Sequence, residues 1–552
     1  MPQKEIFLRI HPHDNVLVAL QNLEQGTMIS FEGTTFALAN NIAAKHKFAI
    51  NELKTGQEIY MYGVLVGKTT STIPQGGLLS TENVHHAAEG FHLGERKLQW
   101  HQPDISHFEG KTFNGYHRTD GSVGTANYWI VVPLVFCENR NIQVLKEALV
   151  DKLGYKKAKS YEGDVEQLME LYQAGKSVEE ILNADIQAST DKPNSKRLFK
   201  NIDGIKFLNH SMGCGGTKDD SDALCGLIAG YITHPNVAGA TVLSLGCQHA
   251  QVSILQAEIA KRDPAFNKPM VVLEQQKVGT ESELLQQALK QTFAGLVQAN
   301  QNQRQPAPLS KLCIGLECGG SDGFSGISAN PALGYVSDML VTMGGSVILA
   351  EFPELCGVEQ ELSDRCTDVE TANRFMQLMT TYNARAEADG SGFYANPSPG
   401  NIRDGLITDA IKSAGAAKKG GTSPVTAVLD YPEKVTKPGL NLLCTPGSDV
   451  ESTTAEVAAG ANIVLFTTGL GTPTGNPVTP VVKLSTNTVM YERMPDIIDI
   501  NCGTIIEGAE TIQQAGERIL NYVIQVANGE AEPKSVKLGQ DDFIPWKRGV
   551  SL

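Results

Sequence analysis

The sequence predicts an α/β protein of several domains, and three features of the chain carry that prediction. Its 552 residues, at roughly 100 to 200 residues per domain, suggest three or four domains. Residues 1–92 contain short β-branched runs between turn signals, which predicts a small β domain. Residues 301–552 alternate apolar runs with helical stretches, which is typical of a parallel sheet covered on both faces.

In the small β domain, the runs that predict strands lie at 6–10, 16–20, 35–38 and 58–66. Residues 93–112 are polar and aromatic with no sustained period, which predicts an interdomain linker.

A middle α/β domain is expected over residues 113–300, beginning with the strand-like run 128–136. Its Lys- and Glu-rich stretch 150–201 predicts a surface elaboration with one amphipathic helix at 165–172. The segment 298–310 is rich in Gln, Asn and Pro, and predicts the junction to the last domain.

The last domain is expected to repeat a short buried strand, a Gly-rich turn and a helix. The expected strands lie at 312–316, 346–351, 425–429, 440–443, 463–466 and 481–484. Ligands of such sheets bind beyond the carboxyl ends of the strands, which is where the Gly clusters fall. We therefore expect the functional site at this edge.

Charge and composition exclude several classes of protein. The net charge is −15 and no basic run is long enough to track phosphates, so nucleic acid is not an expected partner. The longest apolar stretches are shorter than the roughly 18 residues that span a bilayer, so no membrane segment is expected. The first residues lack the apolar core of a secretory signal, which predicts a cytoplasmic protein. Its ten cysteines are then core residues or metal ligands rather than a disulfide framework.

Cys214, Cys247 and Cys318 share one context, a Gly-rich turn directly after a strand-like run. Thiols at equivalent ends of parallel strands can converge on one site. The functional interpretation is iron, held as a cluster with one open iron or as a single divalent ion. The alternative, that each cysteine is a small core residue, stays open.

Two further groups near these thiols are candidate acid–base residues, namely His249 and Glu317. Lys419 lies beside two glycines and Ser423, and a desolvated amine there can act as a base or bind a carboxylate. The planar guanidinium of Arg118, in a Gly-rich run with Asp120, also suits a carboxylate, although a surface Asp/Arg turn is the alternative.

Polar turns of the last domain supply the remaining candidates for substrate binding, which are Asn396, Asn401, Ser423, Asp449 and Gly471. The turn 469–475 that contains Gly471 lacks the third glycine of a dinucleotide fingerprint, which disfavours a nicotinamide oxidoreductase.

In the first domain His11 follows a strand and Glu82 lies in a later loop. Both are candidate metal ligands, and an exposed loop is the alternative for each.

Motifs along nearly the whole chain together resemble the altronate and galactarate dehydratase family of sugar-acid hydro-lyases. They are IHPHDNV, HRTDGSVGTANYWIVVP, GCGGTKDD, SLGCQ, GLECGGSDGFSGISANPALG, NPSPGN, PGLNLL, PGSD and VLFTTGLGTPTG. The string ECGGSDGFSGISANP is highly specific. Where the family commonly carries His-x-His-Asn, this chain reads STEN at 80–83, which raises Glu82 as a substitute ligand.

The resemblance implies an N-terminal SAF-type β-clip domain, a middle domain involved in dimer contacts, and a C-terminal Rossmann-like parallel sheet of unusual connectivity. It implies a homodimer that depends on ferrous iron, with Mn²⁺ as a substitute. The implied reaction is dehydration of D-altronate to 2-keto-3-deoxy-D-gluconate in hexuronate catabolism.

This chemistry accounts for the residue inventory, because removing water across C2 and C3 requires abstraction of a weakly acidic proton alpha to a carboxylate. We expect the three cysteines near iron, Arg118 on the substrate carboxylate, and Lys419 or His249 in proton transfer. Three alternatives remain. They are a galactarate dehydratase or sulfolactate-type lyase, an iron–sulfur redox protein and a non-catalytic sugar-acid binding protein. The wide spacing of the cysteines disfavours the redox protein.

Overall fold

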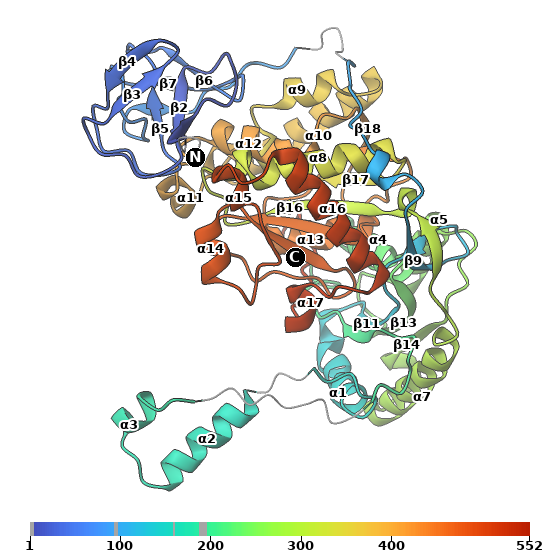
Figure 1. Ribbon diagram of the computed structural model, residues 1–552. Helices are drawn as coiled ribbons and strands as arrows, with labels where there is room; N and C mark the ends of the chain where they lie inside the picture. Colours follow the sequence, from blue (N-terminus) through green and yellow to red (C-terminus); the bar gives the residue numbers. More distant parts are fainter. Residues whose placement is uncertain (1–4, 93–97, 158–160, 187–195, 552) are drawn as a thin grey trace.

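The computed structural model describes residues 5–92, 98–157, 161–186 and 196–551, and arranges them in three regions (Figure 1). A small β domain lies at one end, a large parallel sheet in the centre and a second α/β region at the other end. The predicted linker 93–112 and the polar stretch 189–197 lie partly outside the described residues. None of the described helices is long and apolar enough to cross a membrane.

The N-terminal β domain consists of short antiparallel strands in three small sheets, ordered β1-β2-β5, β3-β4 and β6-β7-β8. The strands are β1 (Phe7–Leu8), β2 (Val16–Ala19), β3 (Met28–Phe31), β4 (Thr34–Ala37), β5 (Lys47–Ala49), β6 (Glu58–Met61), β7 (Val64–Thr69) and β8 (Val84–His85). The run 58–66 forms two strands rather than one, because Tyr62 and Gly63 take positive φ angles of 59° and 81° and turn the chain. Their backbone N–H groups donate to the carboxylate of the buried Asp14.

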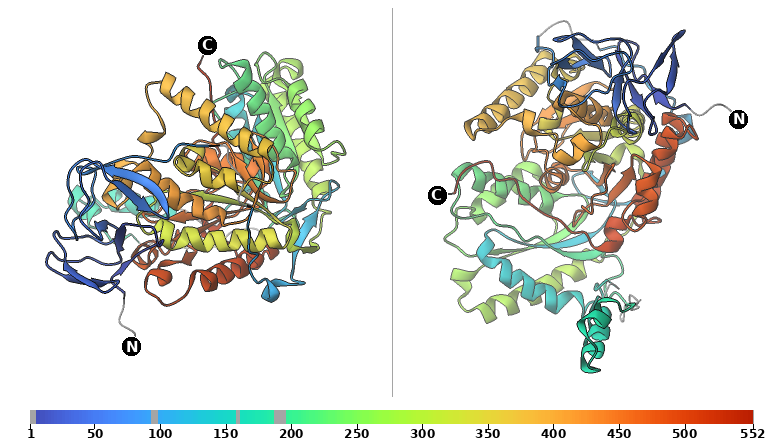
Figure 2. Two further views of the ribbon diagram at one scale, coloured as in Figure 1. Left: turned by 90° about the horizontal axis from the view of Figure 1, so that it is seen from above. Right: turned by 90° about the vertical axis from the view of Figure 1, so that its left-hand side faces the viewer.

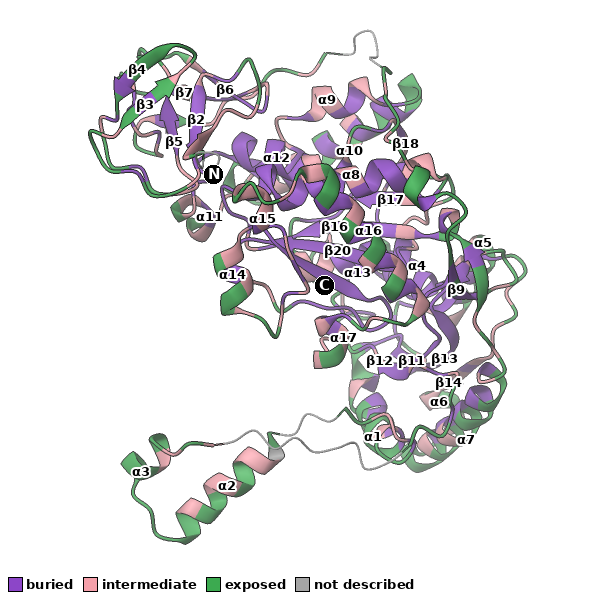
Figure 3. Ribbon diagram, in the orientation of Figure 1, coloured by how far each residue is buried: buried purple, intermediate pink, exposed green. Residues whose placement is uncertain are grey.

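The middle region is built on a parallel sheet of order β12-β11-β13-β14, named the middle sheet here. Its elements, with the preceding strands, are η1 (Ser106–Phe108), β9 (Thr112–His117), β10 (Val123–Gly124), β11 (Tyr128–Pro133), η2 (Phe136–Glu138), α1 (Asn139–Val150), α2 (Glu162–Gln173), α3 (Val178–Leu182), β12 (Gly204–Phe207), α4 (Lys218–Thr233), β13 (Val237–Ser244), α5 (Val252–Arg262), β14 (Met270–Glu274), α6 (Gln275–Val278) and α7 (Glu281–Ala299). Trp129 of β11 is fully buried against Gly295, where an added Cβ would lie 2.1 Å from the indole ring. The predicted helix 165–172 falls within α2, which extends with α3 away from the rest of the molecule (Figures 1 and 3).

The predicted junction 298–310 contains a strand, β15 (Gln305–Pro308), which pairs antiparallel with β9. The junction is therefore a hydrogen-bonded connection, because the backbone of β15 completes a ladder of order β10-β9-β15.

The last region contains a parallel sheet of order β18-β19-β17-β16-β20-β21-β22, named the C-terminal sheet here. Its elements are η3 (Leu309–Lys311), β16 (Cys313–Cys318), η4 (Ser325–Ile327), α8 (Ala329–Thr342), β17 (Ser346–Leu349), η5 (Phe352–Leu355), α9 (Glu359–Asp364), α10 (Val369–Ala388), η6 (Phe393–Ala395), α11 (Pro399–Arg403), α12 (Asp409–Ala417), η7 (Lys418–Gly420), β18 (Val425–Leu429), β19 (Gly439–Leu443), α13 (Asp449–Ala459), β20 (Ile463–Thr468), β21 (Val481–Ser485), α14 (Thr488–Arg493), β22 (Ile500–Asn501), α15 (Gly503–Ile506), α16 (Ile512–Asn528) and α17 (Lys534–Leu538). The first strand, β16, lies in the interior of the sheet, with β17 on one side and β20 on the other. The chain thus changes direction across the sheet at β16, which is where ligands of open α/β sheets bind.

The connectivity of the C-terminal sheet is unusual because β19 inserts between β17 and the earlier strand β18. Successive residues of β17 point to opposite faces: Val347 and Leu349 pack in one apolar core, and Ile348 packs in the other. Helices therefore cover both faces, and the central strands are buried (Figure 3). The predicted α/β class, with its N-terminal β domain and C-terminal parallel sheet, is confirmed.

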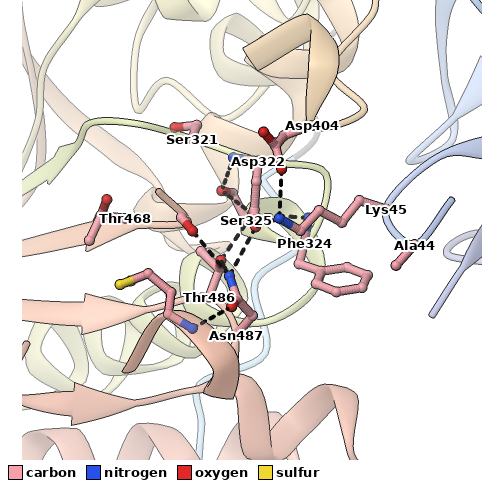
Figure 4. A network of polar contacts seen from close by, with 12 residues as sticks. Ala44, Lys45, Ser321, Asp322, Phe324, Ser325, Asp404, Thr468, Thr486 and Asn487 are labelled. Carbon is pink, nitrogen blue, oxygen red and sulfur yellow. Dashed lines mark hydrogen bonds and ion pairs between the residues drawn. The ribbon is translucent and has the colours of Figure 1, made fainter. Parts of the chain in front are cut away.

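The N-terminal β domain is held against the C-terminal region by buried polar contacts (Figure 4). Lys45 Nζ lies 3.1 Å from Asp322 Oδ2 and 2.8 Å from Asp404 Oδ1. Lys47 Nζ donates to Gly405 O at 2.6 Å. In both views of Figure 2 the blue β domain lies beside orange segments of the C-terminal region, and Thr408 at the start of α12 donates to Val66 O of β7.

Candidate active site

Charged side chains meet at the carboxyl ends of β16 and β17. Glu317 and Cys318 are the last residues of β16, and Glu351 follows β17 by two positions. Because these strands are adjacent and parallel, both ends lie at the same edge of the C-terminal sheet. Glu351 has φ of 62°, a left-handed conformation that is rare for a residue with a Cβ and is typical of functional sites.

Lys419 connects these two strand ends. Its Nζ lies 2.8 Å from Cys318 Sγ and 2.7 Å from Glu351 Oε2. The side chains of Lys419 and Glu351 are each only 1% exposed, so the ion pair is shielded from water. Cys318 Sγ also lies 3.2 Å from Glu354 Oε2.

A second ion pair extends the group toward the surface. Lys412 Nζ of α12 lies 2.7 Å from Glu354 Oε1, and these side chains are 9% and 4% exposed. The same amine donates to Asn396 Oδ1 at 2.9 Å. Asn396 is half-buried.

Other carboxylates surround the pairs and are incompletely hydrogen-bonded. Ser452 donates to Glu317 Oε2 at 2.8 Å, and the N–H of Leu316 donates to Glu456 Oε1 at 2.9 Å. The other oxygens, Glu317 Oε1, Glu351 Oε1 and Glu456 Oε2, are buried without a hydrogen-bond partner. Unpaired buried oxygens are costly, so this excess of carboxylates favours a cation or bound protons.

Two glycines allow the carboxylates to approach the backbone of β16. A Cβ at Gly319 would lie 2.0 Å from Asp449 Oδ2, and one at Gly315 would lie 2.5 Å from Glu456 Oε2. Side chains at either position are therefore sterically excluded.

The protonation states follow from burial and from these neighbours. Burial, together with the charges of Glu351 and Glu456, raises the pKa of Glu317 well above its ordinary value. Burial would lower the pKa of Lys419, but the adjacent Cys318 and Glu351 outweigh it and hold that pKa well above its ordinary value. Burial, and then the charges of Glu351 and Glu354, also raise the pKa of the Cys318 thiol well above its ordinary value, so Glu351 is the charged partner in the ion pair. Lys419 is thus a fixed positive charge.

The pKa of Asp449, at the start of α13, is raised into the neutral range. Burial, and then the charges of Glu351 and Glu354, raise its pKa to about 7. A carboxyl group with this pKa exchanges protons near neutral pH, which suits general acid–base catalysis.

The group also fits a metal ion. Donor atoms of Cys318, Glu351 and Glu354 all lie within 4.8 Å of one another, and all three residues are buried. One thiol and two carboxylates, with an unpartnered oxygen on Glu351, form a donor set that suits a divalent transition metal.

The three predicted cysteines do not share this site in the described part of the chain. Cys214 and Cys247 lie in exposed turns after β12 and β13 of the middle sheet. Their turns contact each other, since the N–H of His249 donates to Gly213 O at 3.0 Å, and the side chain of His249 is exposed there. Of these three cysteines, only Cys318 contacts Lys419.

Arg118 and Asp120 hold a turn of the middle region. The guanidinium of Arg118 donates to Pro235 O at 2.8 Å and to Asn127 Oδ1 at 2.9 Å. Asp120 Oδ1 accepts from the backbone N–H and the hydroxyl of Ser122.

The predicted polar turns of the last region have mixed outcomes, with Asn396 and Asp449 lying in or beside the buried group. Asn401 instead takes part in the capping box of α11 and donates to Ser321 O at 2.8 Å. Ser423 is buried with its N–H bonded to Asp338, and Gly471 packs against Met494.

The first-domain candidates lie apart from the buried group. The ring of His11 packs against Gly63, where an added Cβ would lie 2.8 Å from its Nδ1. Glu82 is exposed, and its backbone carbonyl accepts from Thr70.

Glu351, Glu354 and Lys412 were not predicted as site residues. The signal that could have identified the two glutamates is the string AEFPEL directly after an apolar strand. Lys412 lies within α12, and its sequence context shows no comparable signal.

Comparisons with known proteins cover all three regions. Residues 5–87 match the altronate/galactarate dehydratase SAF domain, residues 115–300 the D-galactarate dehydratase/altronate hydrolase second domain, and residues 309–551 the D-galactarate/altronate dehydratase C-terminal domain. The chain is 33% identical to altronate dehydratase of Bacillus subtilis over 549 residues, covering 99% of each chain. The chain belongs to the altronate/galactarate dehydratase family.

Two Escherichia coli members of this family are similar to the chain over nearly its full length. Altronate dehydratase is 32% identical, covering 99% of this chain and 100% of the relative. Galactarate dehydratase (L-threo-forming) is 31% identical, covering 97% of this chain and 95% of the relative. The family resemblance inferred from the motifs is thereby confirmed.

Proposed function

We propose that the protein is a hydro-lyase that dehydrates D-altronate to 2-keto-3-deoxy-D-gluconate. The observation that carries this proposal is the buried group of Cys318, Glu351, Glu354 and Lys419, named the Cys318 group here. It lies at the end of β16, the strand at which the chain changes direction across the C-terminal sheet. The altronate dehydratases that align over 99% of this chain support the choice of substrate.

We propose that the reaction uses a divalent cation, and that the cation is ferrous iron, with Mn²⁺ as a substitute. Cys318, Glu351 and Glu354 would hold it, because their donor atoms converge and Glu351 Oε1 lacks a partner. When bound, such an ion acts as a Lewis acid toward substrate oxygens. This ligand set replaces the expectation of three thiolates, since Cys214 and Cys247 lie in turns of the middle sheet.

Lys419 supplies the charge that the reaction requires. Loss of the proton alpha to a carboxylate leaves an enediolate-like anion, and a buried ammonium stabilises it without first having to reorganise. Because its pKa is held well above the ordinary value, Lys419 remains protonated and acts as an electrostatic group rather than as the base.

Asp449 is the proposed proton-transfer residue. Its pKa of about 7 lets it accept a proton at neutral pH, and Gly319 gives its carboxylate room beside β16. This assignment replaces Lys419 and His249 in that role.

The substrate carboxylate is proposed to bind beside Lys412 and Asn396, where the amide nitrogen Nδ2 of Asn396 is buried without a hydrogen-bond partner. Lys412 stays positively charged, because Glu354 outweighs the effect of burial and raises its pKa. Arg118 holds a turn of the middle region through Pro235 and Asn127, whereas Lys412 belongs to the buried group, so we assign the carboxylate-binding role first expected of Arg118 to Lys412.

The test is a panel of D-altronate, galactarate and sulfolactate, assayed under reducing conditions with Fe²⁺ and separately with Mn²⁺. We expect 2-keto-3-deoxy-D-gluconate from D-altronate with the largest kcat/KM. If galactarate is turned over with the larger kcat/KM, galactarate replaces D-altronate as the proposed substrate. It is the second candidate because the chain is 31% identical to galactarate dehydratase. No keto acid from any of the three would refute a hydro-lyase acting on these acids.

We further propose that the protein is cytoplasmic and, as the family resemblance implies, a homodimer. Light scattering should give twice the mass of the 59.4 kDa chain, and a monomer at micromolar concentration would contradict it.

A further inference from the structure

A second group of metal-type donors lies between the N-terminal β domain and the C-terminal region. Donor atoms of His86, Cys356 and Asp409 all lie within 4.8 Å of one another. His86 follows β8, Cys356 follows η5, and Asp409 is the first residue of α12. Segments far apart in sequence thus bring an imidazole, a thiol and a carboxylate together, and this group shares no residue with the Cys318 group.

Packing around these donors fixes the three segments relative to one another. A Cβ at Gly357 would lie 3.2 Å from that of Ala410 and 3.3 Å from that of Ala88. The N–H of His92 donates to Gln360 Oε1 at 2.8 Å. Thr408 caps α12 and donates to Val66 O of β7 at 2.8 Å. The donors are therefore held close before any ligand binds.

The hydrogen bonds of the donors leave capacity for a ligand. Asp409 is 2% exposed, and its Oδ2 is buried without a hydrogen-bond partner. His86 Nδ1 accepts only a long hydrogen bond, 3.3 Å, from the N–H of Ala410. This bond directs the lone pair of Nδ1 at the first turn of α12, which carries Asp409, and a metal ion bound through Nδ1 would replace it.

We propose that His86, Cys356 and Asp409 bind a divalent transition-metal ion of the zinc type that joins the N-terminal β domain to the C-terminal region. Thiolate, imidazole and carboxylate together are ligands of Zn²⁺ and of Fe²⁺, and Zn²⁺ is most often four-coordinate. A water molecule would complete four-coordination. Mg²⁺ and Ca²⁺ are excluded because they prefer oxygen ligands.

The ion would connect elements that also carry residues of the proposed active site. Glu354 lies two positions before Cys356, and Lys412 lies one helical turn after Asp409. Binding would thus fix η5 and α12 relative to each other and to the β domain, which makes the three ligands positioning residues rather than catalytic ones.

The test uses the metal-free full-length chain titrated with Co²⁺, whose bond to a thiolate gives a charge-transfer absorption band. Cys318→Ser removes the thiol of the other group, so the part of the remaining band that depends on Cys356 reports on this site. We expect a band of one equivalent in Cys318→Ser and its loss in Cys318→Ser/Cys356→Ser. Cys318→Ser/Cys137→Ser, which removes an exposed cysteine, is the matched control and should retain the band.

Zn²⁺ affinity, measured in the Cys318→Ser background by competition with a chromophoric chelator, provides the second readout. His86→Ala and Asp409→Asn should each weaken Zn²⁺ binding by more than about tenfold. Removing a residue that only hydrogen-bonds to a metal ligand already weakens binding by about 10–100-fold, and removing a ligand itself should cost more. His85→Ala, at the exposed neighbouring position, should leave it unchanged. A band that survives Cys356→Ser, or affinities unaffected by His86→Ala and Asp409→Asn, would overturn the proposal. The dehydration assay does not enter this test, so failure here leaves the proposed function standing.

Discussion

The adjacent lysines Lys418 and Lys419 allow the energetic role of the buried ion pair to be measured against a matched control. Lys419→Met keeps the length of the side chain but removes the charge 2.7 Å from Glu351 Oε2. At an effective dielectric constant near 20, that separation corresponds to about 6 kcal/mol of gross attraction. Desolvation offsets part of it, and breaking a buried pair costs about 3–5 kcal/mol in free energy of unfolding. Lys418 Nζ lies 3.9 Å from Glu361 Oε2, with both side chains about one-third exposed, so Lys418→Met should cost at most about 1 kcal/mol.

The decrease in the free energy of unfolding caused by Lys419→Met should also depend on pH, and it should be larger at high pH. Burial, and then the charge of Glu354, already raise the pKa of Glu351, and the charge of Lys419 is the largest of the influences that lower it. Without Lys419 the folded pKa rises further above the unfolded value, so the folded state binds more protons and stability falls as pH rises. Urea unfolding followed by circular dichroism should show a larger deficit relative to the wild type at pH 8 than at pH 5. Equal deficits for Lys419→Met and Lys418→Met at pH 8 would refute the buried-pair account.

Three further predictions concern the site and the contact between domains. Asp449→Asn should lower kcat/KM by about 10²–10⁴-fold and abolish its rise through pH 7, whereas the exposed Asp496→Asn should leave the pH profile intact. Gly319→Ala should lower kcat at least tenfold because its Cβ would lie 2.0 Å from Asp449 Oδ2, whereas Gly90→Ala, whose nearest neighbour lies at 3.9 Å, should not. Asp322→Asn should lower the free energy of unfolding by about 3 kcal/mol, because a fully buried carboxylate pairs with Lys45 and accepts from Thr486, whereas Asp404→Asn, at a site 29% exposed, should cost about 1 kcal/mol or less.

Apolar patterning predicted much of the C-terminal sheet, because a fully buried parallel strand must be apolar on both faces. The expected strands at 312–316, 346–351 and 463–466 correspond to β16, β17 and β20. The order of these strands could not be predicted, because it depends on crossover connections and on the insertion of β19 beside β17. For the same reason, the ion pairs between the end of β16, the end of β17 and η7 were not predictable.

The prediction that three cysteines converge on one site failed because the sequence did not show how the strands are arranged in sheets. Cys214, Cys247 and Cys318 all follow a strand in a Gly-rich turn, so their local sequences are equivalent. In the structure two of them follow strands of the middle sheet, and the third is the last residue of β16 in the C-terminal sheet. A local pattern shows that a strand ends at a residue, but it does not show which sheet the strand joins.

The central claim is that the site lies at the Cys318 group of the C-terminal sheet. The most direct measurement is keto-acid formation from D-altronate by iron-reconstituted Cys318→Ser, compared with the double variant Cys214→Ser/Cys247→Ser under the same reducing conditions. The structure predicts a loss of kcat/KM of more than about 100-fold in Cys318→Ser and wild-type turnover in the double variant. Wild-type turnover in Cys318→Ser, with loss of activity in the double variant, would contradict it and would move the site to the turns of the middle sheet.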